Sequence, residues 1–117
     1  MTPVEFRRHL HRHPELSFRE TESARFIAEA LREAGIPCRP IAGTGVLAKI
    51  EGRGDLRRAV VLRADIDALP IREQSGAAWS SENDGVMHAC GHDMHTACLL
   101  GALLVLNRHK SEIAGTV

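Results

Sequence analysis

The sequence has 117 residues, of which 44% are apolar and 26% charged, and this composition is typical of one soluble globular domain. The formal net charge is zero, with basic and acidic residues interleaved, so no overall field would attract nucleic acid or an anionic membrane. The main apolar run, about ten residues near the C-terminus, is roughly half of what a bilayer crossing requires. We therefore expect a protein that binds neither nucleic acid nor membranes.

The cysteines and the N-terminal residues favour a cytoplasmic location. Cys38, Cys90 and Cys98 are odd in number and do not form the pattern of a disulfide framework. The N-terminal charges have no apolar segment behind them, so they do not predict a secretory signal.

A first helix is predicted over residues 3–13, ended by Pro14 because proline disfavours helical geometry in the residue before it. His9, His11 and His13 are spaced two residues apart, and side chains at that spacing point away from each other on a helix. We interpret them as solvated or packing histidines rather than a metal cluster.

Residues 21–34 carry apolar side chains at three- and four-residue intervals and stop before Gly35, which predicts an amphipathic helix. Residues 36–41 hold two prolines and are typical of an edge strand. Two short apolar runs, 46–50 and 59–62, flank a glycine-rich turn and predict a hairpin. The second run is apolar on both faces, as expected of a central strand covered on both sides.

Two carboxylates, Asp65 and Asp67, follow the run 59–62. The carboxyl ends of central strands are where open α/β sheets place active sites, and residues at i and i+2 of an extended chain share a face. The alternative is that Asp67 caps the following turn and that Asp65 pairs with Arg63 or Arg72.

Residues 88–95 form the segment richest in metal-binding groups. His88, Cys90 and His92 alternate, so on an extended backbone all three could converge on one centre. Cysteine with histidine suits zinc and similar divalent metals, but Cys-x-His supplies two ligands where a site needs four or more. Asp93 is a plausible helix N-cap.

The rest of the chain completes an α/β pattern. Residues 71–87 predict a long loop, in which Trp79 is interpreted as a packing anchor. A buried helix is expected from Asp93 to about residue 107 or 109, and residues 115–117 resemble the start of another strand. The order helix, helix, strand, strand, loop, helix predicts an α/β fold whose sheet is unfinished.

Three blocks, residues 6–16, 62–70 and 87–97, resemble in the same order three blocks of the metal-dependent amidohydrolases of the aminoacylase/carboxypeptidase type. That family includes hippurate hydrolases, indole-3-acetyl-amino-acid hydrolases and N-acetyldiaminopimelate deacetylases. The resemblance implies a zinc-peptidase-like fold, here an incomplete three-layer sandwich with a mixed sheet and flanking helices. It also implies that residues 1–117 are the N-terminal portion of the metal-binding catalytic domain, without the rest of that domain or the inserted dimerisation domain.

The resemblance further implies hydrolysis of the amide bond of N-acyl amino acids, with two divalent metal ions (manganese, zinc, nickel or cobalt) as cofactors and a homo-oligomeric full-length enzyme. It makes Cys90 a bridging thiolate, His92 a metal ligand, and Asp67 the catalytic-site carboxylate that orients a ligand. In the wider group a histidine stands where Asp65 stands here. The remaining ligands and the general-base glutamate are expected beyond residue 117, so we expect the isolated chain to bind metal weakly and hydrolyse nothing.

Two other interpretations stay open. In a thiol hydrolase, Cys90 would be a nucleophile activated by His88 or His92. In a non-catalytic module, a structural zinc would be closed by Cys90, His92 and two of His88, Asp93 and His95, although such sites normally draw on two separated ligand pairs and only one cluster exists here.

Overall fold

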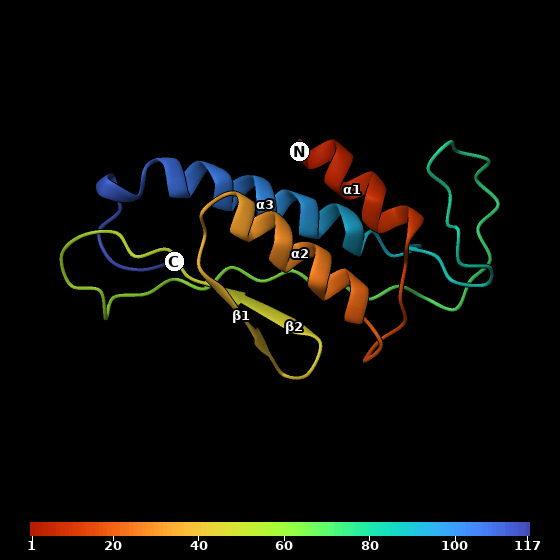
Figure 1. Cartoon of the computed structure of the whole chain (residues 1–117), viewed down its shortest axis with the longest axis horizontal. Helices are drawn as coiled ribbons and strands as arrows, with labels where there is room; N and C mark the ends of the chain where they lie inside the picture. The colour runs from red at the N-terminus through yellow and green to blue at the C-terminus, as the bar shows by residue number, and fades with distance from the viewer.

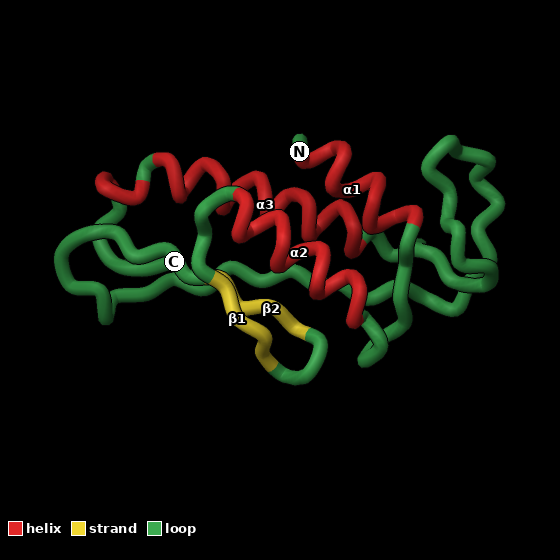
Figure 2. The backbone as a smooth tube through the Cα atoms, viewed as in Figure 1, coloured by secondary structure: helices red, strands yellow, loops and turns green.

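The computed structural model describes all 117 residues and shows three helices packed together, with a small sheet and long extended segments beside them (Figure 1; Figure 2). In chain order the elements are α1 (Pro3–Arg12), α2 (Thr21–Glu33), β1 (Cys38–Ile41), β2 (Gly45–Ala48), α3 (His92–Arg108) and the short 3-10 helix η1 (Lys110–Glu112).

Helix α1 begins with a capping box. The Glu5 amide donates to Thr2 Oγ1 over 3.2 Å, and the Thr2 amide donates to Glu5 Oε2 over 2.7 Å. This exchange satisfies two amides that a helix N-terminus otherwise leaves unpaired. The helix predicted over 3–13 is confirmed, with its last turn closing before Pro14.

Helix α2 confirms the amphipathic pattern predicted over 21–34. Ile27 and Leu31 are buried on one face, and Gly35 follows the helix with a φ of +69°, a conformation that glycine adopts without strain. The carboxylate of Glu15 caps its N-terminus by accepting the Ser23 amide over 2.6 Å.

The hydrophobic core lies between the helices and the start of the hairpin. Phe6 on α1 is fully buried and stacks on Phe26 of α2, with ring centroids 5.1 Å apart. The other buried apolar members are Leu10, Ile27, Leu31, Ile36, Ile50, Ala97 and Leu100. All three helices and the hairpin flanks contribute to this one cluster.

The hairpin differs from the one predicted. Strand β1 pairs with β2 in antiparallel register, from Cys38 opposite Ala48 to Ile41 opposite Gly45, so residues 46–50 do not pair with 59–62. The tight turn between β1 and β2 joins two adjacent runs, and this shorter closure prevails over the glycine-rich turn further along.

Residues 59–62, predicted as a central strand, are extended but exposed. Val60 is 61% and Val61 is 83% exposed, so the segment is not covered on both faces. The Val60 amide donates to the Thr116 carbonyl over 3.0 Å, and Thr116 also bridges to Glu51. The C-terminal residues therefore pair as a strand would, but the apolar side chains of residues 59–62 stay largely exposed.

Helix α3 confirms the predicted C-terminal helix, with two corrections. Its N-cap is Gly91, with a φ of +88°, and Asp93 instead lies inside the first turn with its side chain fully buried. Only one face is buried, by Asp93, Ala97 and Leu100, while Val105 is 57% exposed. No helix combines the length and the apolar character that a membrane crossing requires.

Candidate metal centre

The segment around residues 65–67 meets the first turn of α3 through two side chains of that helix. His92 Nδ1 lies 2.9 Å from Asp67 Oδ1 and 3.0 Å from the Asp67 carbonyl oxygen. Thr96, one turn further on, donates from Oγ1 over 3.0 Å to the Asp65 carbonyl, with the His92 carbonyl also within 2.8 Å. Because both partners of His92 Nδ1 are acceptors, this nitrogen carries the proton and Nε2 keeps a free lone pair.

Cys90 and His92 flank Gly91, the N-cap of α3. The Cys90 thiol is free and exposed, and no side-chain hydrogen bond joins it to His88 or His92. The structure therefore presents an unpaired thiol and an oriented imidazole at the start of one helix. Both are soft or borderline ligands of the kind that zinc and cobalt accept.

His88 does not join them, contrary to the convergence suggested by the alternation. It is 5% exposed, both of its ring nitrogens are buried without a partner, and its ring centroid lies 6.3 Å from that of His11. Burial lowers the pKa of His88, which keeps this imidazole neutral. No three histidine, cysteine or carboxylate side chains come together to hold a metal ion, so the structure gives no closed zinc site.

The two carboxylates after the predicted strand have separate partners. Asp65 Oδ1 lies 2.5 Å from Arg63 Nη2 in an exposed ion pair, as one of the two interpretations expected. Asp67 faces His92 instead of capping a turn. Leu69 and Met87 exchange backbone hydrogen bonds of 2.9 Å, which brings the two segments alongside each other next to this pair.

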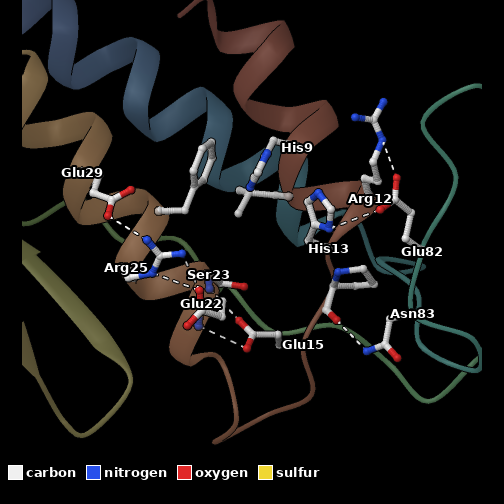
Figure 3. Close-up of a pocket in the computed structure, with 13 residues that line it drawn as sticks. His9, Arg12, His13, Glu15, Glu22, Ser23, Arg25, Glu29, Glu82 and Asn83 are labelled. Carbon is white, nitrogen blue, oxygen red and sulfur yellow. Dashed lines mark hydrogen bonds and ion pairs between the residues drawn. The ribbon is translucent and has the colours of Figure 1, made fainter.

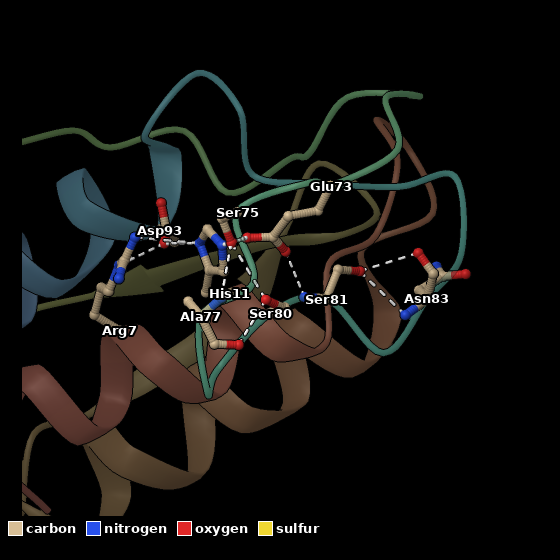
Figure 4. Close-up of polar contacts among 9 residues, drawn as sticks. All are labelled: Arg7, His11, Glu73, Ser75, Ala77, Ser80, Ser81, Asn83 and Asp93. Atoms are coloured by element: carbon tan, nitrogen blue, oxygen red, sulfur yellow. Dashed lines mark hydrogen bonds and ion pairs between the residues drawn. The ribbon is translucent and has the colours of Figure 1, made fainter.

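A second histidine, His11 of α1, lies at the centre of a buried polar network that reaches α3 through Asp93 (Figure 4). Its Nδ1 is 2.7 Å from Asp93 Oδ2, and its Nε2 is 2.8 Å from Glu73 Oε1. Arg7 Nε also lies 2.7 Å from Asp93 Oδ2, in an ion pair whose angle does not suit a hydrogen bond. The side chains of His11, Asp93 and Glu73 are 6%, 0% and 5% exposed.

The network is electrically balanced. Each ring nitrogen of His11 faces a carboxylate oxygen, and only the imidazolium form has a proton on both. Arg7 Nη2 is 3.2 Å from His11 Nδ1, but that nitrogen cannot accept from Arg7 while it donates to Asp93, and we assign the hydrogen bond to the shorter contact with a carboxylate. Two cations then offset the two carboxylates of Asp93 and Glu73.

Glu73 ties the long loop to this network. Burial opposes its ionisation, but hydrogen bonds from the Ser81 amide, His11 and Ser75 outweigh that effect and lower the pKa of this carboxyl to about 2. The Ser81 amide is 2.5 Å from Oε2, and the Ser75 hydroxyl is 2.7 Å from Oε1.

The loop is held against α1 at further points. The Arg8 guanidinium lies 4.1 Å over the Trp79 ring, so Trp79 anchors the loop, as predicted. Asn83 Nδ2 donates to the Pro14 carbonyl over 3.1 Å. The loop therefore has a defined position relative to α1 and the first turn of α3.

Arg7, His11 and Glu73 are the residues that the sequence interpretation missed. Reading His11 as a packing side chain rather than a ligand was compatible with its place in the structure, but its partner Asp93 is 82 residues away in the chain. The one available signal was the i, i+4 spacing of Arg7 and His11 beside the buried Leu10. Nothing in the local sequence marks Glu73.

A cavity of about 600 Å³ lies between α1, α2 and the loop, away from this centre (Figure 3). Its charged side chains pair with one another: Arg25 contacts Glu22 over 2.6 Å and Glu29 over 3.0 Å. Asp67, Cys90 and His92 do not line it. We therefore do not assign it as the functional site.

An imidazole oriented by a carboxylate, beside a free thiol at a helix N-terminus in an α/β layer, is an arrangement typical of metal-dependent enzymes. Comparison with known families agrees: residues 61–117 match the model of peptidase family M20/M25/M40. The chain is thus similar to this family, and relatives that match nearly its whole length are named as deacetylases, amidohydrolases and carboxypeptidases.

Two curated relatives illustrate the match. An N-acetyl-L-cysteine deacetylase of Bacillus subtilis is 50% identical over 115 residues, which are 97% of this chain and 27% of the relative. An N-acyl-L-amino acid amidohydrolase of Geobacillus stearothermophilus is 44% identical over 115 residues, 97% of this chain and 31% of the relative. The chain thus spans about a third or less of the length of these relatives.

A solved structure confirms the α/β class. The Bacillus subtilis YXEP protein, described as a dinuclear metal binding peptidase from the M20 family, superposes with a TM-score of 0.94 and 47% identity. The match covers 98% of this chain and 33% of that protein. The helices and hairpin therefore form part of an M20-type α/β fold, as the sequence resemblance predicted.

Proposed function

We propose that this chain forms the metal-binding edge of the catalytic domain of an amidohydrolase that cleaves the amide bond of N-acyl amino acids. The observation that carries the proposal is the 2.9 Å contact between Asp67 and His92, two residues from the free thiol of Cys90. Relatives named as a deacetylase and an amidohydrolase, and a neighbour described as dinuclear, support this chemistry.

Cys90 and His92 would hold the metal. The exposed thiol fits a bridging thiolate, and the free Nε2 of His92 fits a terminal ligand. The donor set suits two divalent ions of the zinc, manganese, nickel or cobalt kind. Two side chains do not complete a metal shell, so we expect the 117 residues by themselves to bind metal weakly.

Asp67 acts through His92. By accepting the Nδ1 proton it fixes the tautomer, limits the rotation of the ring and makes Nε2 a stronger donor. Bound divalent ions supply Lewis acidity, which activates water and polarises an amide carbonyl. We assign no general base among the described side chains: Glu73 is saturated with hydrogen bonds, and Asp65 is paired with Arg63.

The remaining parts of the proposal concern the whole enzyme. We propose residues 1–117 as the N-terminal portion of its catalytic domain, a cytoplasmic location, and a homo-oligomer in the full-length form. The substrate class follows from the relatives and not from a pocket in this chain.

Cobalt(II) titration of the purified chain tests the metal site, because a thiolate bound to cobalt gives a charge-transfer absorption in the near ultraviolet. We expect a weak but saturable band that Cys90→Ser abolishes and His92→Ala weakens. Cys98→Ser is the matched control, because Cys98 is also free and exposed, and it lies on the helix that follows Cys90. A band that survives Cys90→Ser and disappears in Cys98→Ser would refute the site.

An assay with N-acetyl amino acids and added divalent metal tests the expectation that the isolated 117 residues hydrolyse nothing. With two metal donors and no assigned base, no turnover above the metal-only reaction is expected. A metal-dependent rate that Cys90→Ser removes would show that the chain is catalytically sufficient, contrary to this expectation.

A further inference from the structure

We propose that Arg7, His11 and Glu73 are positioning residues, which fix the metal-binding turn at the start of α3 through the side chain of Asp93. This inference rests on the proposed function, since it assigns His92 to a metal. It extends that function to a buried network that makes no contact with Cys90 or His92 itself.

The first turn of α3 is fixed from two directions. On one side His92 and Thr96, one turn apart, bond to the segment at Asp65 and Asp67. Asp93 follows His92, about 100° further round the helix, and faces α1. The contacts on the two sides together determine both the rotation of the turn and its position along the helix axis.

His11 is the component that joins three elements. Its ring lies between Asp93 of α3 and Glu73 of the long loop, and its backbone belongs to α1. An imidazolium has N–H groups on two sides of a rigid ring, whereas a glutamine amide has donors at one end only. Glutamine therefore cannot reach two carboxylates on opposite sides as the imidazolium does.

Loss of the bridge should disturb the orientation of His92 as well as lower stability. The bonds to Asp67 require Nδ1 to face a carboxylate and a carbonyl at the same time, so a small rotation of the turn breaks at least one of them. Changing the outer partners of a metal ligand typically lowers metal affinity by about 10- to 100-fold. We expect a change in this range for the network, although its residues lie one step further from the metal.

The variants are His11→Gln, which breaks the bridge, and Glu73→Gln, which keeps an acceptor for His11 and should have a smaller effect. His109→Gln is the matched control, because His109 is an exposed histidine at the far end of α3. Ile27→Val, a mild change in the core of α2, controls for loss of stability away from the turn.

The first readout needs no metal. In ¹⁵N NMR spectra of the metal-free chain at about pH 8, above the ordinary imidazole pKa of about 6.5, wild-type His92 should be mostly in the tautomer with the proton on Nδ1. In His11→Gln the tautomer with the proton on Nε2, which a free imidazole favours, should increase. The second readout is cobalt(II) affinity, expected to fall by about 10- to 100-fold.

The outcomes separate this inference from the proposed function. Unchanged His92 tautomers in a folded His11→Gln chain would overturn the inference, whatever the metal does. Equal losses of affinity in His11→Gln and Ile27→Val would do the same, because the network would then matter only for stability. If His11→Gln does not fold, Glu73→Gln decides by the same readouts. A wild-type chain that binds no cobalt would count against the proposed function alone, and the tautomer measurement would still decide the inference.

Discussion

Two histidine–carboxylate contacts lie on different faces of the first turn of α3, and they use the imidazole differently. His92 gives only Nδ1 to Asp67, and their side chains are 18% and 26% exposed. His11 gives both nitrogens to carboxylates, Asp93 and Glu73, and is almost fully buried. The same pair of functional groups thus leaves one nitrogen available in the first case and none in the second.

The number of free ring nitrogens distinguishes a histidine that can bind metal from one that holds the fold together. A partly exposed histidine with an oriented, unused nitrogen can accept a metal, whereas a buried histidine with two ionic partners holds elements together. Substitutions on the His11 side should therefore change stability strongly and metal binding through His92, whereas those on the His92 side should change mainly metal binding.

The largest effect is expected for Asp93→Ala. The substitution leaves Arg7 and His11 buried beside each other without their shared anion, and removing one partner of a buried ionic network typically costs about 3–5 kcal/mol. Urea unfolding followed by circular dichroism measures the loss. Asp84→Ala is the control, because Asp84 is exposed and its ion pair should contribute no more than about 0.5 kcal/mol. A cost below about 1 kcal/mol for Asp93→Ala would show that the network is not stabilising.

The second effect is a loss of stability in acid that depends on Glu73. Its folded-state pKa is about 2, below its ordinary value of 4.5, so its contribution is complete above pH 4.5 and disappears as the pH falls towards 2. Hydrogen bonds to a buried charged group suggest a contribution of about 1–3 kcal/mol. Urea midpoints measured across this pH range should fall less steeply in Glu73→Gln than in the wild type. Parallel curves for the two proteins would contradict the assignment.

Asp67→Ala should have a smaller effect on folding than on metal binding. The carboxylate is partly exposed, so its loss should cost about 0.5–1.5 kcal/mol of stability. Without it the His92 ring is free to rotate and to exchange tautomers, and cobalt affinity should fall by about 10- to 100-fold. Asp65→Ala serves as the control, since Asp65 pairs with the exposed Arg63. Equal losses of affinity in the two variants would indicate a general charge effect instead.

The sequence predicted the His92 side of this comparison better than the His11 side. Asp67, Cys90 and His92 lie in short dense motifs, where residue type and spacing already suggest metal chemistry. The network of Arg7, His11 and Glu73 depends on contacts across 62 to 86 residues, which no local spacing encodes.

The same distinction applies to the fold. The three helices were predictable because their periodicity and their stop signals are local, as in Thr21–Glu33 followed by Gly35. The pairing of the run 46–50 was predicted wrongly, because the choice between two turns depends on which partner strand closes first in space. The alternation of His88 with Cys90 also misled, since His88 turns into the interior beside His11.

The smallest effect on folding is expected for Cys90→Ser, and this variant tests most directly whether metal binding can be lost without loss of stability. The thiol is exposed and makes no hydrogen bond in the structure, so the free energy of unfolding should change by no more than about 0.5 kcal/mol. Metal binding should nevertheless be lost, because a serine hydroxyl is a far weaker ligand for these ions than a thiolate. Parallel urea unfolding and cobalt titration should therefore distinguish the two variants: Cys90→Ser should lose metal binding alone, whereas Asp93→Ala should lose stability and, through the displaced His92, metal affinity as well. A large loss of stability in Cys90→Ser would mean that the thiol contributes to folding, and the separation of binding from structure would fail at that residue.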